Sequence, residues 1–234
     1  GNNVAIGDAA LTTQDAGATA YNVAIGYDAG QALSTAIRST IIGGQAGSAI
    51  TTGSENTFIG YTAGAATTIG NKNVAIGGEA LVTNVAADCN VAVGLEALKS
   101  MTSAVTSDTF NTAVGYRAGL SVTSGNANTF VGGLAGDVAT DTETSVFIGK
   151  DAGGLTTSGS RLTFVGTDAG NAANYSGSNL TAIGFNADPS AAGATDEFTL
   201  GDSAVATLRC AVNTITLISD ERDKTDIQDI DYGL

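Results

Sequence analysis

Two pairs of carboxylates have the type and spacing that could support catalysis. Asp151 and Asp168 are separated by the same distance in sequence as Glu79 and Glu96. If that spacing, about 17 residues, is one repeating unit, each pair lies on neighbouring units, ~5 Å apart. Carboxylates at about that separation can hydrolyse glycosidic bonds, so a glycan-depolymerising enzyme is one hypothesis. We favour it least, because the chain has no His or Trp and Arg117 follows in the next unit, where it can balance the charge of Glu96.

Acidic loop residues form the other group with possible chemistry. Asp137, Asp141, Glu143, Asp196 and Glu197 offer the oxygen ligands that a hard cation such as Ca²⁺ prefers. The glycine-rich nonapeptide repeat of calcium-binding β-rolls is absent, however. We therefore expect neither a metal site nor a cofactor.

The elements that position these residues follow from an internal repeat. Residues 56–64, Asn-Thr-Phe-Ile-Gly-Tyr-Thr-Ala-Gly, recur in altered copies along the chain, and most of the intervals between copies are equal. We use the first glycine of each copy as a marker: Gly7, Gly26, Gly43, Gly60, Gly77, Gly94, Gly115, Gly132, Gly149, Gly166, Gly184 and Gly201. A constant period of this kind predicts a stack in which each unit buries its apolar side against the next.

The fold class predicted from this repeat is all-β: a parallel β-roll or β-solenoid of twelve rungs, each of about 17 residues. Frequent glycine and the lack of a 3.6-residue period argue against amphipathic helices. The residue before each marker glycine is always Ile, Val or Leu, so we expect it to face the interior of the rung. The residue before that is usually Ala or Phe, which makes the strand apolar on both faces. Further copies of the chain are the simplest cover for the other face, so we expect a homo-oligomer, and the resemblances described below imply a homotrimer, intertwined or side by side.

Four columns of residues should shape each rung. The glycines Gly26, Gly43, Gly60, Gly77 and Gly94 predict positive φ or no room for a Cβ, and the alanines three residues later, Ala29, Ala46, Ala63, Ala80 and Ala97, predict a crowded site. Asparagine four residues before the marker predicts a stacked amide ladder. Phe130, Phe147 and Phe164 predict an aromatic ladder, and Cys89 and Cys210 should be small buried residues too far apart to pair.

Composition excludes several classes of partner. The formal net charge is −14 with nine Lys and Arg, which argues against nucleic acid and anionic membranes. No stretch approaches the ~20 apolar residues of a membrane helix. We therefore expect no nucleic-acid binding and no membrane insertion.

Two resemblances add a function to this fold. Segments such as Asn22-Val23-Ala24-Ile25-Gly26 resemble the head repeats of trimeric autotransporter adhesins, which form left-handed parallel β-rolls packed as three chains; the unit here is longer. The segment Ser219-Asp220-Glu221-Arg222-Asp223-Lys224-Thr225-Asp226-Ile227 resembles the start of the endosialidase-type intramolecular chaperone domain that ends many bacteriophage tail fibres and tailspikes.

The chaperone resemblance implies a maturation reaction. That domain trimerises the fibre before it and then cuts itself off, which would make Ser219 the nucleophile and Lys224 the base of the self-cleavage. Asp223 departs from the leucine usual in the family. The stretch 219–234 is too short to form the whole domain, so we expect this chain to be catalytically inert.

The sequence thus predicts three segments: a fibre shaft over 1–205, a terminal strand or cap over 206–218, and a chaperone remnant over 219–234. We expect a structural, adhesive part of a phage tail fibre, located on the virion or otherwise extracellular, that reaches a receptor on the host surface, of which a glycan is one class. The alternative is a bacterial trimeric surface adhesin, and the less favoured interpretation is the glycan-depolymerising tailspike.

Overall fold

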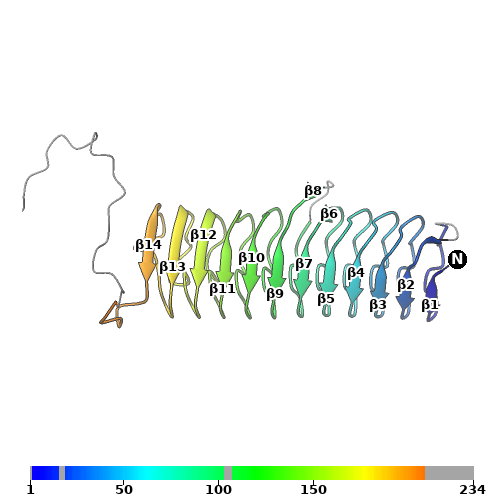
Figure 1. Ribbon diagram of the computed structural model, residues 1–234, viewed down its shortest axis with the longest axis horizontal. Coiled ribbons are helices and arrows are strands. Elements are labelled where there is room, and N and C mark those ends of the chain that lie inside the picture. The colour runs from blue at the N-terminus through cyan, green and yellow to red at the C-terminus, as the bar shows by residue number, and fades with distance from the viewer. Residues whose placement is uncertain (1, 16–18, 103–106, 209–234) are drawn as a thin grey trace, which may run out of the picture. The chain divides into compact units, whose positions relative to one another are not determined.

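The computed structural model describes residues 2–15, 19–102 and 107–208. Two compact units divide the chain, Gly1–Asp202 and Ser203–Leu234, and of the second only residues 203–208 are described. The first unit is a single parallel β-solenoid (Figure 1). The predicted fold class is therefore confirmed, while Ser219, Lys224 and Cys210 lie outside the described residues.

Twelve strands form one sheet in which every neighbouring pair is parallel. They are β1 (Val4–Ile6), β2 (Val23–Ile25), β3 (Thr40–Ile42), β4 (Thr57–Ile59), β5 (Val74–Ile76), β7 (Val91–Val93), β9 (Thr112–Val114), β10 (Thr129–Val131), β11 (Val146–Ile148), β12 (Ser160–Val165), β13 (Ser178–Ile183) and β14 (Glu197–Leu200). The register pairs equivalent positions of each repeat, such as Phe58 with Ala75. A second sheet joins β6 (Ala87–Asp88) to β8 (Ser107–Asp108).

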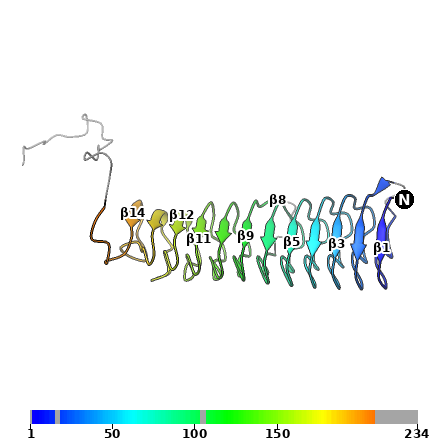
Figure 2. The same ribbon diagram turned by 60° about the horizontal axis from the view of Figure 1, so that its bottom comes forward.

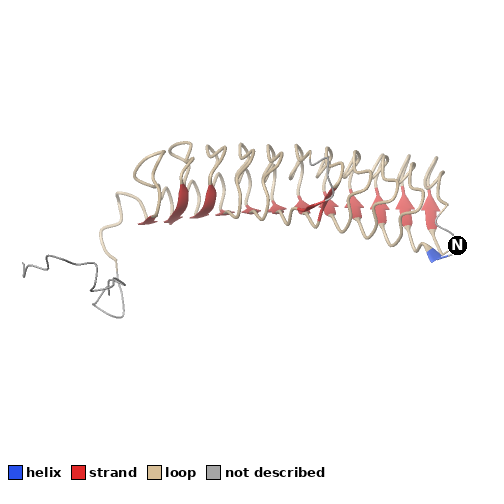
Figure 3. Ribbon diagram, turned by 90° about the horizontal axis from the view of Figure 1, so that it is seen from above, coloured by secondary structure: helices blue, strands red, loops and turns tan. Residues whose placement is uncertain are grey.

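Most strands are short because left-handed residues lie on both sides of them. Glu55, just before β4, has a φ of 63°, and Thr62, just after it, has a φ of 53°. The equivalent positions of the repeat are left-handed in every rung from β2 to β13. These bends turn the chain back on itself, so the strands form one side of the stack and the loops return along the other (Figures 2 and 3).

The core is the narrow interior of the rungs, filled by the residue two positions before each marker glycine. Ala24, Ile41, Phe58 and their equivalents up to β13 have no solvent exposure. The predicted aromatic ladder is confirmed: ring centroids are 5.5 Å apart for Phe130 and Phe147 and 5.1 Å apart for Phe147 and Phe164. Tyr175 extends this ladder edge-on, 5.8 Å from Phe164.

Two positions of the same rung share one space in the core, so the size of the side chain at one limits the size at the other. Where the core strand residue is Phe, as at Phe58, the residue six positions later is glycine, and a Cβ on Gly64 would come within 2.6 Å of the Phe58 ring. Where the core residue is Ala, as at Ala75, a buried leucine can occupy that later position, as Leu81 does in a left-handed conformation with φ of 54°. From β2 to β11 the two positions never both hold a large residue, although both are small where Ala24 is followed by Gly30 and Ala113 by Gly119, so close packing allows at most one large residue of the two.

Candidate functional site

The outward face of the main sheet is the candidate functional surface of the described residues. It is formed by the residues immediately before each marker glycine and by those two positions earlier, which are Val, Ile, Leu, Thr or Phe. Ile6 is 57% exposed, Ile76 37% and Ile148 39%, whereas the core residues Ala75 and Phe147 that lie between these two columns are fully buried. The sequence-based expectation that the residue before the glycine faces the rung interior is therefore wrong.

The reason for this error is that both faces of the strand are apolar. Alternation shows which residues share a face, but it does not show which face lies inside. The interior is narrow and takes the Ala or Phe column, so the branched residues form a ladder on the outside. A continuous, partly exposed apolar strip of this kind is typical of an interaction surface.

The two long edges of this face carry exposed aromatic residues. We call the residue five positions before each marker glycine the leading corner of its rung and the residue directly after that glycine the trailing corner. Tyr21 and Phe110 are exposed leading corners of the β2 and β9 rungs. Exposed trailing aromatic residues occur at four rungs: Tyr27, Tyr61, Tyr116 and Phe185.

The marker glycines make the close approach of successive rungs possible. Gly60 has a φ of 139°, and a Cβ there would lie 2.5 Å from the carbonyl oxygen of Gly77 in the next rung. Gly26, Gly43, Gly77 and Gly94 have the same conformation and the same kind of backbone neighbour one rung on. The alanines after them, Ala29, Ala46, Ala63, Ala80 and Ala97, have no exposed surface. Ala204, by contrast, is exposed, so the crowded site predicted for every copy does not extend to the last one.

The predicted amide ladder is present and buried. The Asn56 side-chain oxygen accepts a hydrogen bond of 2.9 Å from the backbone N–H of Asn73, whose own side-chain oxygen accepts one of 3.0 Å from Asn90. The Asn56 amide group also donates to the carbonyl of Gly70 at 2.8 Å, and Asn73 donates to that of Ala87 at the same distance. Each asparagine therefore ties the start of one strand to the loop of its own rung and to the next rung.

The first pair of candidate catalytic carboxylates is held in ion pairs. Lys99 Nζ lies 2.6 Å from Glu79 Oε2 and 2.7 Å from Glu96 Oε1, and Arg117 Nε lies 2.5 Å from Glu96 Oε2. Hydrogen bonds from Lys99 and then Arg117 lower the pKa of Glu96. A general acid would need a raised pKa, so the surroundings of Glu96 favour charge balancing over acid catalysis.

The second carboxylate pair is no better arranged for catalysis. Asp151 pairs with the neighbouring Lys150, and Asp168 accepts a hydrogen bond of 3.3 Å from Asn171. In the described ranges, no three Cys, Asp or Glu side chains gather as a metal site would require, and this covers the acidic loops named above.

Cys89 differs from the sequence-based expectation. It is a leading corner with φ of 62°, and its thiol is partly exposed, with Sγ 3.4 Å from Asp108 Oδ1. Partial removal of solvent raises the pKa of the thiol, and the hydrogen bond to Asp108 adds to this. The expectation of a buried cysteine is wrong because leading corners lie outside the core.

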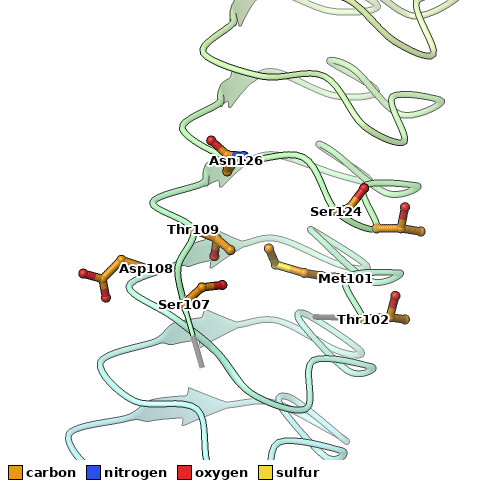
Figure 4. Close-up of a pocket in the computed structure, with 8 residues that line it drawn as sticks. Met101, Thr102, Ser107, Asp108, Thr109, Ser124 and Asn126 are labelled. Carbon is orange, nitrogen blue, oxygen red and sulfur yellow. The ribbon is translucent and has the colours of Figure 1, made fainter. Parts of the chain in front are cut away.

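A pocket of about 620 Å³ lies beside the second sheet, where the repeat unit is longest (Figure 4). Met101, Ser107, Asp108, Ser124 and Asn126 are among the side chains that line it. Residues 103–106, which come between Thr102 and Ser107 in the sequence, are outside the described part of the chain, so we assign no ligand to this pocket.

Comparison of the chain with models of protein families, with curated proteins and with solved structures finds no match. No helix within the described ranges has the length and apolar character needed to cross a membrane. Functional inference therefore depends on the geometry of the solenoid and on the sequence motifs.

Proposed function

We propose that this chain is the shaft of a homotrimeric attachment fibre, of the kind found in bacteriophage tails, in which three parallel copies cover the outward face of one another's sheets. The observation that carries the proposal is the ladder of branched apolar residues, each partly or largely exposed on a single chain, along the stack from β1 to β14. Twelve rungs at ~4.8 Å each give a ladder of roughly 55 Å. Burying such a strip between copies removes apolar surface from water along the whole shaft.

The other features of the molecule agree with a mechanical role. The rungs are tied by backbone and asparagine hydrogen bonds, and the carboxylates considered for catalysis are neutralised or hydrogen-bonded, so we propose no enzymatic activity for the shaft. The excess of acidic residues keeps the surfaces of neighbouring fibres apart. The chain then acts outside the infected cell, as an extended shaft that contributes to attachment at the host surface.

We favour a tail fibre over a bacterial surface adhesin because of the segment that begins at Ser219. If it starts a chaperone domain, the complete gene product should split between Ile218 and Ser219, and Ser219→Ala and Lys224→Ala should each block the cut while trimers still form. Intact mass of the product measures this. An uncut wild-type product, or a cut that persists in Ser219→Ala, would remove the support for the tail-fibre assignment.

The trimer itself can be tested with a matched pair of substitutions. Ile76 on the outward face and Ile69 in a loop are almost equally exposed, at 37% and 38%. We expect Ile76→Asp to place a charge in the interface and shift the protein from trimer to monomer in sedimentation equilibrium. Ile69→Asp should leave the trimer intact. Equal behaviour of the two variants would mean that the outward face is not the interface.

A further inference from the structure

The aromatic residues at the two edges of the outward face are matched rung by rung. Among the leading corners from β2 to β14, only Tyr21 and Phe110 are aromatic. Both belong to rungs whose trailing corner is also aromatic, namely Tyr27 at β2 and Tyr116 at β9. All four side chains are between 46% and 57% exposed, so each of these rungs presents an aromatic group at both edges of the face.

The two aromatic residues of a rung cannot pack on each other within one chain, because the whole strand separates them. In an assembly with a rotation axis along the stack, however, the leading edge of one copy lies beside the trailing edge of the next. Aromatic pairs placed there gain contact energy beyond the area that they bury. In this arrangement each of the four rings would pack against an aromatic ring of a neighbouring copy.

We infer that the copies of this chain stand parallel and in register, and that two aromatic clasps set the register: Tyr21 on Tyr27 of the neighbouring copy, and Phe110 on Tyr116 of the neighbouring copy. The inference rests on the trimer proposed above and adds the residues that align it. An apolar ladder alone specifies register weakly, since each rung resembles the next. The clasps distinguish particular rungs from the others and so specify the register.

A displacement by one rung would lose both clasps. Tyr21 would then lie opposite Asp8 or Gly44, and Phe110 would lie opposite a leucine or a glycine. A displacement by one rung in either direction therefore pairs aromatic with aromatic at neither place. The two clasped rungs also follow the two longest intervals between marker glycines, Gly7 to Gly26 and Gly94 to Gly115, so β2 and β9 are distinguished from the other rungs in two ways.

Charged residues near the corners include pairs that match in this register, but they do not distinguish it from a displaced one. At β5 the leading corner is Lys72, and Glu79 follows the trailing corner of that rung. At β12 Arg161 is matched in the same way by Asp168. A displacement of one rung the other way would match Arg38 with Asp28 and Arg161 with Asp151 in the same manner, and Glu79 is already paired with Lys99 of its own chain, so the inference on register rests on the aromatic corners alone. At β14 both corners are aspartate, so no clasp forms there.

Light-induced coupling of tyrosine side chains can test this register, because only rings in contact join efficiently. We would irradiate a mixture of isotope-labelled and unlabelled chain with a ruthenium photo-oxidant and identify coupled peptides by mass spectrometry. The wild-type chain should give Tyr21–Tyr27 products between copies. In Phe110→Tyr, the introduced tyrosine should couple to Tyr116.

Two further variants detect a displaced register. Cys89→Tyr and Ala127→Tyr place a tyrosine at the leading corners one rung before and one rung after β9. In register, each should couple to Tyr116 several-fold less than Phe110→Tyr does. A stronger yield from either variant, or a trimer with no coupling between Tyr21 and Tyr27, would overturn the inference and leave the trimer standing. A monomer by sedimentation would overturn the proposed function, and the inference with it.

Discussion

The sharing of core space by Phe58 and Gly64 can be tested by removing the large side chain at the first position and introducing one at the second. Phe58→Ala removes a fully buried ring and should cost about 3–5 kcal/mol of unfolding free energy. Gly64→Leu adds a side chain 2.6 Å from that ring, which should cost about 1–3 kcal/mol for overpacking and about 1–2 kcal/mol for its left-handed backbone. The two variants together should cost roughly 5–10 kcal/mol if the sites are independent.

The double variant Phe58→Ala/Gly64→Leu recreates the combination that the next rung has in Ala75 and Leu81. Leu81 shows that leucine is accommodated there at a φ of 54°. We therefore expect the double variant to be about 2–3 kcal/mol more stable than the sum of the single variants predicts, which is a large coupling energy.

Urea unfolding of all four proteins at one chain concentration measures this coupling, because any contribution of assembly to stability is then compared at the same concentration. Phe130→Ala/Gly64→Leu is the control, since its two sites lie on rungs far apart and their effects should add. An additive result for Phe58→Ala/Gly64→Leu would refute the argument that one pocket is shared by the two positions.

Three other changes test the rung geometry and its electrostatics. Gly60→Ala should prevent or severely weaken folding, because its Cβ would meet the Gly77 carbonyl; wild-type circular dichroism and melting of this variant would contradict the stacking. Thr144→Asn should raise stability by ~0.5–1 kcal/mol in urea unfolding, since Thr144 has φ of 53° and asparagine tolerates that conformation better. The pKa of Glu96 is lowered in the folded chain, so its stabilising effect is complete above the unfolded value of 4.5 and is lost as pH falls through the folded pKa. Glu96→Gln should flatten that part of the stability–pH curve, and an unchanged curve would contradict the ion pairs.

Much of the fold could be predicted from the sequence because the same residue types recur at equivalent positions of each rung. A glycine at every copy indicated the close backbone contact seen at Gly60, and the asparagines indicated the buried ladder that includes Asn73. Repetition within one chain thus supplied the constraint on each position.

Other features of the structure could not be predicted from the sequence. The left-handed corners hold residues as different as Arg38, Lys72 and Ala127, so residue type does not mark them. The two faces of a strand such as β5 are both apolar, and only the closed path of the backbone decides which one is inside. The outward face was therefore assigned to the wrong column, although the need for a cover on one face was recognised.

We propose that two other copies of this chain cover the outward face of its sheet. The molar mass of the chain in solution, measured by sedimentation equilibrium at micromolar concentration, tests it most directly. If three copies assemble, the measured mass should be three times the chain mass of 23.0 kDa. A species of 23.0 kDa that persists as the concentration is raised would contradict it, because the exposed ladder would then have no copy of the chain as its partner.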